Sequence, residues 1–345
     1  MKKVALSVML GTIGTLSPFC RAAPPVPLNP ASIVTPPLDR TAPAPTLKTA
    51  EGTLVPQTIV SPLGKTLALQ FNDEFDAITD PADGLPDVDR SKWNTTFWQG
   101  SGERTLAGNG EAQYYVDKQY GGAGNISVEK RPNPFSYHDG KLVISATKVP
   151  QEMWGNYWMG EQRPFCSGLI ESNTHFDFKY GYIEGRFKLP ANRGAWPAFW
   201  LLPYDPAKPA AREHPWPPEI DIFEAFGHRP DKFTTGIIAP EAEKPDIKLT
   251  RWMQEPGVDL SKDFHTWGLA WDERTVVYTF DGKEVSRSNT TPSFQTPMYL
   301  LINLAVGGKW YSDEMKAAGT PHSAWEVDET TMPWEMECDY VRVYQ

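Results

Sequence analysis

The chain has 345 residues but only three cysteines and six histidines, and it contains no run of basic residues. It shows no Cys–His spacing typical of a zinc site, no Gly-rich phosphate loop and no Gly-x-Ser-x-Gly elbow. With 33 basic against 43 acidic side chains its formal net charge is −10, whereas binding to nucleic acid needs clustered Lys and Arg. No stretch approaches the roughly 20 apolar residues of a membrane span. We therefore expect no nucleic acid partner and no membrane span.

Aromatic residues and proline are plentiful. The chain has 13 Trp, 13 Tyr and 16 Phe, together 12% of the residues, and 33 Pro. Aromatic side chains bury large areas in a core, but so many of them also raise the idea of flat apolar platforms on the surface.

The N-terminus is typical of an export signal. Two lysines precede an apolar run over 4–16, and small residues follow near position 22, which is the order of a secretory signal peptide. We predict a signal over 1–22 and a secreted or periplasmic protein. Cys166 and Cys338 then remain, and either a disulfide or two separate buried thiols fits the sequence.

A proline-rich segment follows the signal. Ten prolines lie between positions 24 and 62, and proline both fixes φ and removes a backbone donor. We predict an extended linker over 23–66 and one domain over 67–345.

The domain reads as all-β. Short runs with period-2 alternation and β-branched or aromatic residues recur between turn residues, at 142–146, 182–188, 275–280, 299–304 and 340–344. Asp281-Gly282 between two such runs predicts a hairpin. Helical periodicity is weak, so we expect a sandwich or barrel of about 280 residues.

Three acids within six residues form the most informative segment. Residues two apart share one face of a strand, so Glu219 and Asp221 point the same way, whereas Glu224 would face the other side of a regular strand. A β-bulge near 222–223 would return Glu224 to their face, and bulges are enriched beside active sites. Three carboxylates so close cannot all ionise freely. A protonated acid beside an ionised carboxylate is what double displacement at a sugar requires.

Two other interpretations fit this segment. Acids that alternate with apolar residues also occur on exposed edge strands, where they are solvated or paired. Three acids could also supply the hard oxygen ligands of a Ca²⁺ site. The aromatic segment 196–200 just upstream favours an interaction with sugar.

The segment 219–224 resembles the bulged signature of glycoside hydrolase family 16, in its laminarinase-like form. The resemblance runs in family order through residues 71–76, 109–115, 180–190, 196–200, 303–308 and 339–344. It implies a β-jelly-roll sandwich of two curved antiparallel sheets with a substrate cleft on the concave face. By position, Glu219 resembles the nucleophile, Glu224 the general acid/base, and Asp221 the residue that holds their protonation states.

Other positions carry over from the same family. Glu184 and Arg186 resemble a pair that touches sugar hydroxyls, with a cross-strand ion pair as the alternative. Trp196 and Trp200 resemble sugar platforms, with plain core positions as the alternative. Asn109 and Asn303 resemble amides that bind sugar, with the capping of a turn as the alternative. Asp339 resembles a ligand of a structural Ca²⁺.

One departure from the family bears on the substrate. Many laminarinase-like members carry a histidine on the strand after the catalytic one, and residues 233–239 contain none. The loop 203–218, rich in proline, precedes the catalytic strand and could close one end of the cleft.

The sequence thus predicts an exported, endo-acting retaining hydrolase of β-linked glucan, with 1,3 or mixed 1,3-1,4 linkages. A transglycosylase or a galactan hydrolase could use the same site, and a non-catalytic lectin could use the same fold. We expect no cofactor for catalysis, a polysaccharide as the partner, and a monomer.

Overall fold

The computed structural model describes residues 44–49, 52–97, 104–120, 126–154, 164–203, 216–240, 243, 249–310, 313 and 327–345. The chain divides into two units, 1–38 and 39–345, and every element below belongs to the second. The predicted signal over 1–22 and the first part of the predicted linker lie outside the described residues. Within the described ranges, no helix is both long and apolar enough to cross a membrane.

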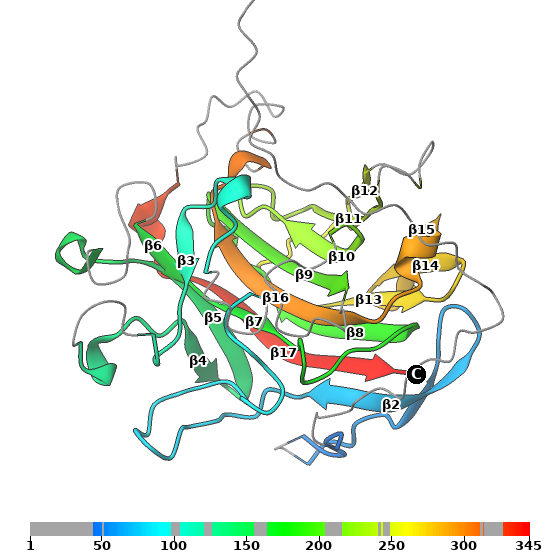
Figure 1. Cartoon of the computed structure of the whole chain (residues 1–345), viewed down its shortest axis with the longest axis horizontal. Coiled ribbons are helices and arrows are strands. Elements are labelled where there is room, and N and C mark those ends of the chain that lie inside the picture. The colour runs from blue at the N-terminus through cyan, green and yellow to red at the C-terminus, as the bar shows by residue number, and fades with distance from the viewer. Residues whose placement is uncertain are drawn as a thin grey trace, which may run out of the picture. The chain divides into compact units, whose positions relative to one another are not determined.

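Among the described residues, the strands form two sheets (Figure 1). The larger has eleven strands in the order β15-β14-β13-β8-β17-β5-β6-β3, while β1 pairs with β2, β2 with β17 and β4 with β5. Its strands are β1 (Thr58–Val60), β2 (Thr66–Asp73), β3 (Gln113–Tyr115), β4 (Phe135–His138), β5 (Lys141–Lys148), β6 (Phe165–Ser167), β8 (Gly181–Lys188), β13 (His265–Trp271), β14 (Thr275–Phe280), β15 (Lys283–Asn289) and β17 (Trp334–Tyr344).

The smaller sheet has six strands in the order β12-β11-β10-β9-β16-β7, with antiparallel neighbours throughout. Its strands are β7 (Leu169–Glu171), β9 (Ala195–Pro203), β10 (Glu219–Ala225), β11 (Phe233–Ile238), β12 (Leu249–Gln254) and β16 (Met298–Val306). Short 3-10 turns occur between strands, at Ala107–Asn109, Val128–Lys130, Gln151–Met153, Pro292–Phe294 and Glu329–Thr331.

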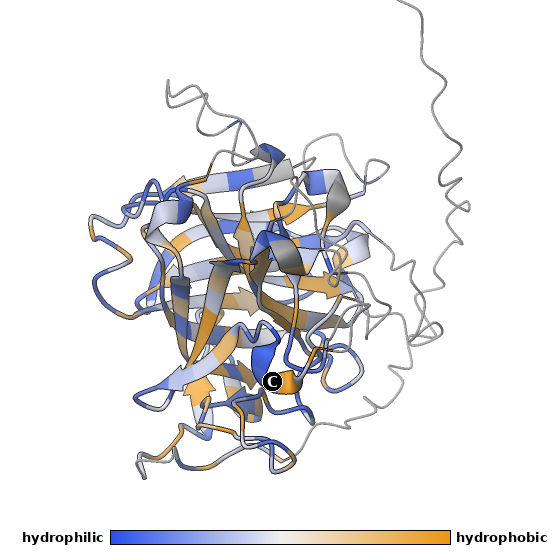
Figure 2. Cartoon of the chain, turned by 90° about the vertical axis from the view of Figure 1, so that its left-hand side faces the viewer, coloured by the Kyte–Doolittle hydropathy of each residue, from blue (hydrophilic) through white to orange (hydrophobic). Residues whose placement is uncertain are grey.

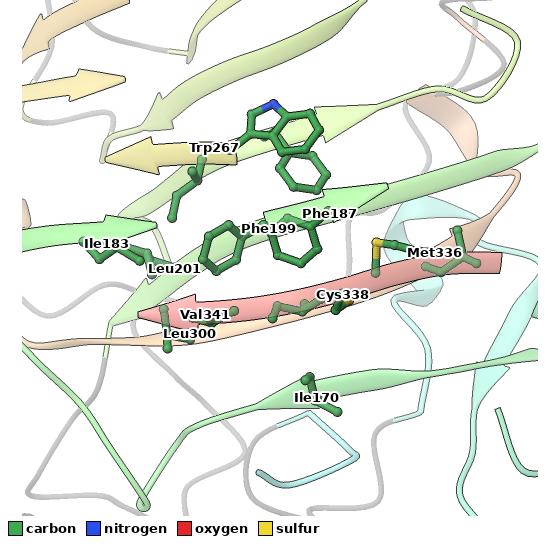
Figure 3. Close-up of a cluster of buried hydrophobic side chains, with 14 of the residues drawn as sticks. Ile170, Ile183, Phe187, Phe199, Leu201, Trp267, Leu300, Met336, Cys338 and Val341 are labelled. Atoms are coloured by element: carbon green, nitrogen blue, oxygen red, sulfur yellow. The ribbon is translucent and has the colours of Figure 1, made fainter. Parts of the chain in front are cut away.

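The two sheets enclose one large apolar core. Phe187 of β8 lies 5.3 Å from the rings of both Phe199 of β9 and Phe223 of β10, so the facing sheets interdigitate. Trp267 of β13 and Leu300 of β16 belong to the same cluster (Figure 3). Figure 2 shows hydrophobic residues gathered on the strands, whereas many of the outer loops are hydrophilic. This is the β-jelly roll that the resemblance implies, in which apolar side chains from both inner faces fill the interior.

The strands predicted from alternation are present, and the predicted hairpin joins β14 to β15. Its two turn residues, Asp281 and Gly282, have φ values of 47° and 73°. Positive φ at both central positions is the type I′ geometry that suits the right-handed twist of a hairpin.

The folded unit begins before position 67, earlier than predicted. β1 pairs with β2, Val55 is buried, and the Thr46 amide donates to the Asn72 side chain at 2.7 Å. Pro56 and Pro62 flank β1, which lies at the edge of its sheet, where proline is tolerated because no ladder bond is lost. The described residues of the predicted linker are therefore part of the domain.

Cys166 and Cys338 are two separate buried thiols. Cys166 pairs with Thr147 of β5, whereas Cys338 pairs with Leu142 of the same strand. At about 3.3 Å per residue, five residues along β5 keep the two sulfurs too far apart for a disulfide.

The turn after β10 offers a test of the packing. A Cβ added to Gly227 would lie 2.1 Å from the Asn192 carbonyl oxygen, and that backbone cannot move aside cheaply. We expect Gly227→Ala to lower the free energy of unfolding by about 1–3 kcal/mol, measured by thermal unfolding. Gly108→Ala is the matched control, because a Cβ there meets no atom within 4 Å. Equal melting temperatures for the two variants would contradict the close approach.

Candidate active site

The three acids lie on one face of β10 because the strand is bulged. Asp221 pairs with Gly236 and Glu224 with Thr234 of β11, so three steps on β10 oppose two on β11. Ile222 and Phe223 both point into the core between the sheets. Glu219, Asp221 and Glu224 therefore project from the opposite face of the six-stranded sheet, here called the acid face. The predicted bulge is confirmed.

Packing explains why the strand takes this form. The Phe223 ring lies 4.6 Å from Trp267 and is fully buried, and burial of such a side chain is worth roughly 2–3 kcal/mol. A regular strand would turn Phe223 outward and put Glu224 into the apolar core, where an unpaired charge is very costly. The bulge avoids both penalties.

Glu224 is held by two donors, one on the neighbouring strand β9 and one on β12, two strands away. Its Oε1 accepts from Trp196 Nε1 at 3.3 Å, and its Oε2 accepts from Arg251 Nε at 3.1 Å. Burial and the negative charge of Asp221 raise the pKa of Glu224 to about 8, although Arg251 opposes that shift. Glu224 is therefore protonated at neutral pH and can donate a proton.

Glu219 sits in a different environment. It is half-buried, and its Oε2 accepts from the indole Nε1 of Trp216 at 2.7 Å. Partial burial and the charges of Asp221 and Glu224 raise the pKa of Glu219 well above its ordinary value. Burial also raises the pKa of Asp221, against the effect of Arg251 and of a hydrogen bond from Glu219. Both shifts favour a proton on this pair of neighbouring acids.

Two tryptophans and an amide lie beside the acids. Trp196 and Trp200 share the acid face of β9, and their rings are largely buried there. The Trp200 Nε1 donates to Asn303 Oδ1 at 2.7 Å, and the Asn303 amide donates to the Tyr115 hydroxyl at 3.0 Å. The structure therefore brings Trp196, Trp200 and Asn303 together with the acids, and the two tryptophans belong to apolar clusters outside the main core.

Asn109 lies at the edge of this group. Its side-chain amide donates to Glu111 Oε1 at 3.0 Å, and Glu111 bridges to Gly307, just after β16. The Glu111 carboxylate also accepts from Gln113 at 2.6 Å. Asn109 is exposed and its carbonyl lies near Gly308, which packs on Trp196.

Glu184 and Arg186 are not part of this site, contrary to the prediction. Their strand, β8, is in the other sheet, and its neighbouring residues Ile183 and Phe187 fill the core. Glu184 and Arg186 therefore project away from the six-stranded sheet. Arg186 pairs with Asp339, and Glu184 lies 3.8 Å from Arg342. The ion pair weighed as the alternative is what the structure contains.

Asp339 is the predicted ligand of a structural Ca²⁺. Its carboxylate is engaged by the Arg186 guanidinium, and a divalent cation would have to compete with that charge. Among the described residues, no group of three His, Cys, Asp or Glu side chains could hold a metal ion. Calcium binding at Asp339 therefore stays a prediction.

Two residues of the site were missed by sequence reasoning, Arg251 and Trp216. Arg251 reaches the acids across β11, where its partner in the register is Gly236. Gly236 and Arg251 lie on different strands and far apart in the sequence, so no local spacing connects them. Trp216 precedes Glu219 by three residues and is 61% exposed. A tryptophan three residues before the first acid is a signal that the sequence does contain.

A jelly roll that carries three neighbouring carboxyl groups and tryptophans on one sheet face has the arrangement expected of a glycosidase. The comparison with known families gives the same class and identifies the family within it. A family model described as glycosyl hydrolases family 16 matches residues 123–327. The chain belongs to this family, which confirms the predicted family, fold and enzyme class.

Several relatives resemble the chain over most of its length. An endo-1,3-1,4-beta-glycanase of Rhizobium meliloti (strain 1021), ExsH, is 32% identical over 279 residues, 81% of this chain. The alignment covers 52% of that protein, so the chain spans about half the length of this relative. Two solved structures align over 81% or more of this chain. SCLam, a non-specific endo-beta-1,3(4)-glucanase, shares 27% identity with a TM-score of 0.61, covering 84% of this chain and 95% of its own. The laminarinase catalytic domain from Thermotoga petrophila RKU-1 shares 28% identity with a TM-score of 0.57, covering 81% of this chain and 98% of its own.

Proposed function

We propose that the chain is an endo-acting retaining hydrolase of β-linked glucan with 1,3 or mixed 1,3-1,4 linkages. The observation that carries this proposal is the pair Glu219 and Glu224 on one strand face, on either side of Asp221 and in unlike surroundings. Two carboxyl groups with separate environments are the acid/base and nucleophile of double displacement.

In the first step, Glu224 acts as the general acid. Protonated at neutral pH, it gives its proton to the glycosidic oxygen as the bond from that oxygen to the anomeric carbon breaks. The Glu219 carboxylate attacks the same carbon and forms a glycosyl ester. In the second step, the Glu224 carboxylate takes a proton from water, the water oxygen attacks the anomeric carbon, and Glu219 leaves. Two inversions retain the β configuration.

Asp221 can accept the proton that Glu219 must lose before it attacks. Glu219 can attack only as a carboxylate, and Trp216 stabilises that form through its 2.7 Å hydrogen bond. When the proton moves from Glu219 to Asp221, the direction of their hydrogen bond reverses and the neutral Asp221 donates to the Glu219 carboxylate. Because Asp221 is buried beside both glutamates, its neutral form also relieves the repulsion among the three acids.

The names of the relatives and the aromatic side chains favour a β-glucan. A pyranose presents an apolar face that can pack on Trp216, which stands exposed beside Glu219. Export as a secreted or periplasmic monomer remains part of the proposal, and it suits an enzyme whose substrate is an extracellular polymer. β11 lacks the histidine that many laminarinase-like members carry on this strand, and most of the predicted loop 203–218 lies outside the described residues. The choice of linkage is therefore part of the test below.

The test is to incubate the protein with laminarin, lichenan, agarose and other β-galactans, and to follow products by proton NMR. We expect oligosaccharides of several lengths from a β-glucan, released first as the β-anomer, because double displacement retains configuration. Release of the α-anomer would contradict the retaining mechanism. Products only from galactans would assign the substrate differently, and products longer than the substrate would indicate transglycosylation. Binding without any product would indicate a lectin.

A further inference from the structure

Arg251 differs from the other residues of the acid face because it is a cation that contacts Glu224, the proposed acid/base. Its Nε donates to Glu224 Oε2 at 3.1 Å, and its Nη2 lies 4.0 Å from Asp221 Oδ2. Asp221 Oδ2 is buried and accepts no hydrogen bond within the described part of the chain. A single guanidinium therefore serves two carboxyl groups of the site, one by contact and one at longer range.

The sheet register explains how Arg251 reaches across a strand. Asp221 of β10 pairs with Gly236 of β11, and Gly236 pairs with Arg251 of β12. Glycine has no side chain, so nothing from β11 stands between the guanidinium and the acids at this row. Trp252, the next residue, packs against the core on the other side of the sheet, which turns Arg251 toward the acid face.

Trp310 fixes the other side of the guanidinium. The Arg251 Cζ lies 4.0 Å from the centre of the Trp310 ring, a cation–π contact. The Trp310 ring packs edge-on against Trp196 at 5.4 Å and against Phe226 at 4.8 Å. Trp196 is itself the second donor to Glu224. The Glu224 carboxyl is thus clamped between a cation and an indole that share one aromatic support.

We propose that Arg251, supported by Trp310, is a positioning residue that stabilises the Glu224 carboxylate formed when the acid gives up its proton. This inference rests on the proposed function, since it deepens the role of Glu224. Proton donation to the glycosidic oxygen leaves Glu224 negative while the charge of Glu219 is lost in the covalent bond. The guanidinium at 3.1 Å meets the new charge, and charge-assisted hydrogen bonds are the strong ones.

Within the described part of the chain, the charged groups that act on Glu224 come from β10 and β12. Asp221 on β10 favours its protonated form and Arg251 on β12 its carboxylate, while Glu219 repels it from the other end of the strand. The neighbouring β9 contributes the neutral donor Trp196, and β11 contributes Thr234, Gly236 and Ile238 to this face, none of them ionisable. Arg251 is the positive charge in this set.

The decisive variant is Arg251→Gln, with Arg287→Gln as control, because Arg287 pairs with Glu284 on β15, in the other sheet. We expect roughly 10- to 100-fold slower hydrolysis of β-glucan, from loss of a charged hydrogen bond. An aryl glycoside with a good leaving group needs little help from the acid, so its cleavage should fall by less than about 3-fold. The alkaline limb of the rate profile should move upward by about one pH unit, because removal of the cation makes Glu224 a weaker acid. Trp310→Leu should produce the same pattern in smaller measure.

Equal losses on both substrates, with the alkaline limb unmoved, would overturn the inference. A ¹³C NMR titration of Glu224, in protein labelled at glutamate, separates this inference from the proposed function because it needs no substrate. A raised Glu224 pKa in Arg251→Gln supports the contact, and an unchanged one contradicts it. If the Glu224 pKa is raised but the wild-type protein cleaves no glycoside, the proposed function is wrong while the contact stands.

Discussion

Replacement of Glu219 by alanine is expected to lower β-glucan hydrolysis by roughly 10⁴- to 10⁶-fold, the loss typical of a removed nucleophile. Without the carboxylate no glycosyl ester can form, while Glu224 can still donate its proton. Azide added to Glu219→Ala should restore cleavage of an aryl glycoside, because the small anion can enter the space that the side chain vacated. The product should be the α-glycosyl azide, formed with a single inversion. Product analysis by NMR checks this, and Glu335→Ala, at an exposed position on β17, is the control.

The same variant should fold at least as well as the wild-type protein. The folded-state pKa of Glu219 is raised by burial and by two neighbouring acids, so the folded protein holds this proton more tightly than the unfolded chain does. Folding stability from this group therefore falls as pH rises above the unfolded value of about 4.3. Glu219→Ala removes that penalty, and its melting temperature should exceed that of wild type more at pH 8 than at pH 4. A large fall in stability would mean that lost activity reflects unfolding.

The bulge on β10 could be predicted because it follows from local pattern alone. Two large apolar residues, Ile222 and Phe223, interrupt the alternation of acids, and only an extra residue keeps all three acids on one face. Arg251 could not be predicted in this way, since its contact depends on the pairing of β11 with β12 and on a glycine at one row. Sequence spacing describes one strand at a time, whereas the order of strands in a sheet is set by long-range packing.

Glu184 and Arg186 illustrate the opposite error. Alternation correctly places both on one face of β8, away from Ile183 and Phe187. It does not reveal which sheet contains β8, and in the eleven-stranded sheet the polar face lies on the far side of the core from the acids. The domain begins before the predicted linker end at residue 66 for another reason. Proline content predicts an extended chain near Pro56 and Pro62, but it does not show that this chain pairs with β2.

Glu224 provides the second large effect, and the expected result differs from that for Glu219. Glu224→Ala should slow the hydrolysis of β-glucan by roughly 10²- to 10⁴-fold, the usual contribution of a general acid. An aryl glycoside with a good leaving group should still form the glycosyl ester on Glu219, since it needs no proton. The ester should then accumulate, because no base remains to activate water, and mass spectrometry would detect it.

The pH profile separates this role from simple damage to the site. In wild type, activity should fall as pH rises through about 8, where Glu224 loses its proton. In Glu224→Gln, which keeps the shape of the side chain, that alkaline limb should disappear from the profile of the residual β-glucan hydrolysis. Persistence of the limb would assign it to another group, such as Glu219 or Asp221, and would exclude Glu224 as the acid. Loss of the limb in Glu224→Gln would identify Glu224 as the acid/base, and azide products from Glu219→Ala would identify Glu219 as the nucleophile of the same double displacement.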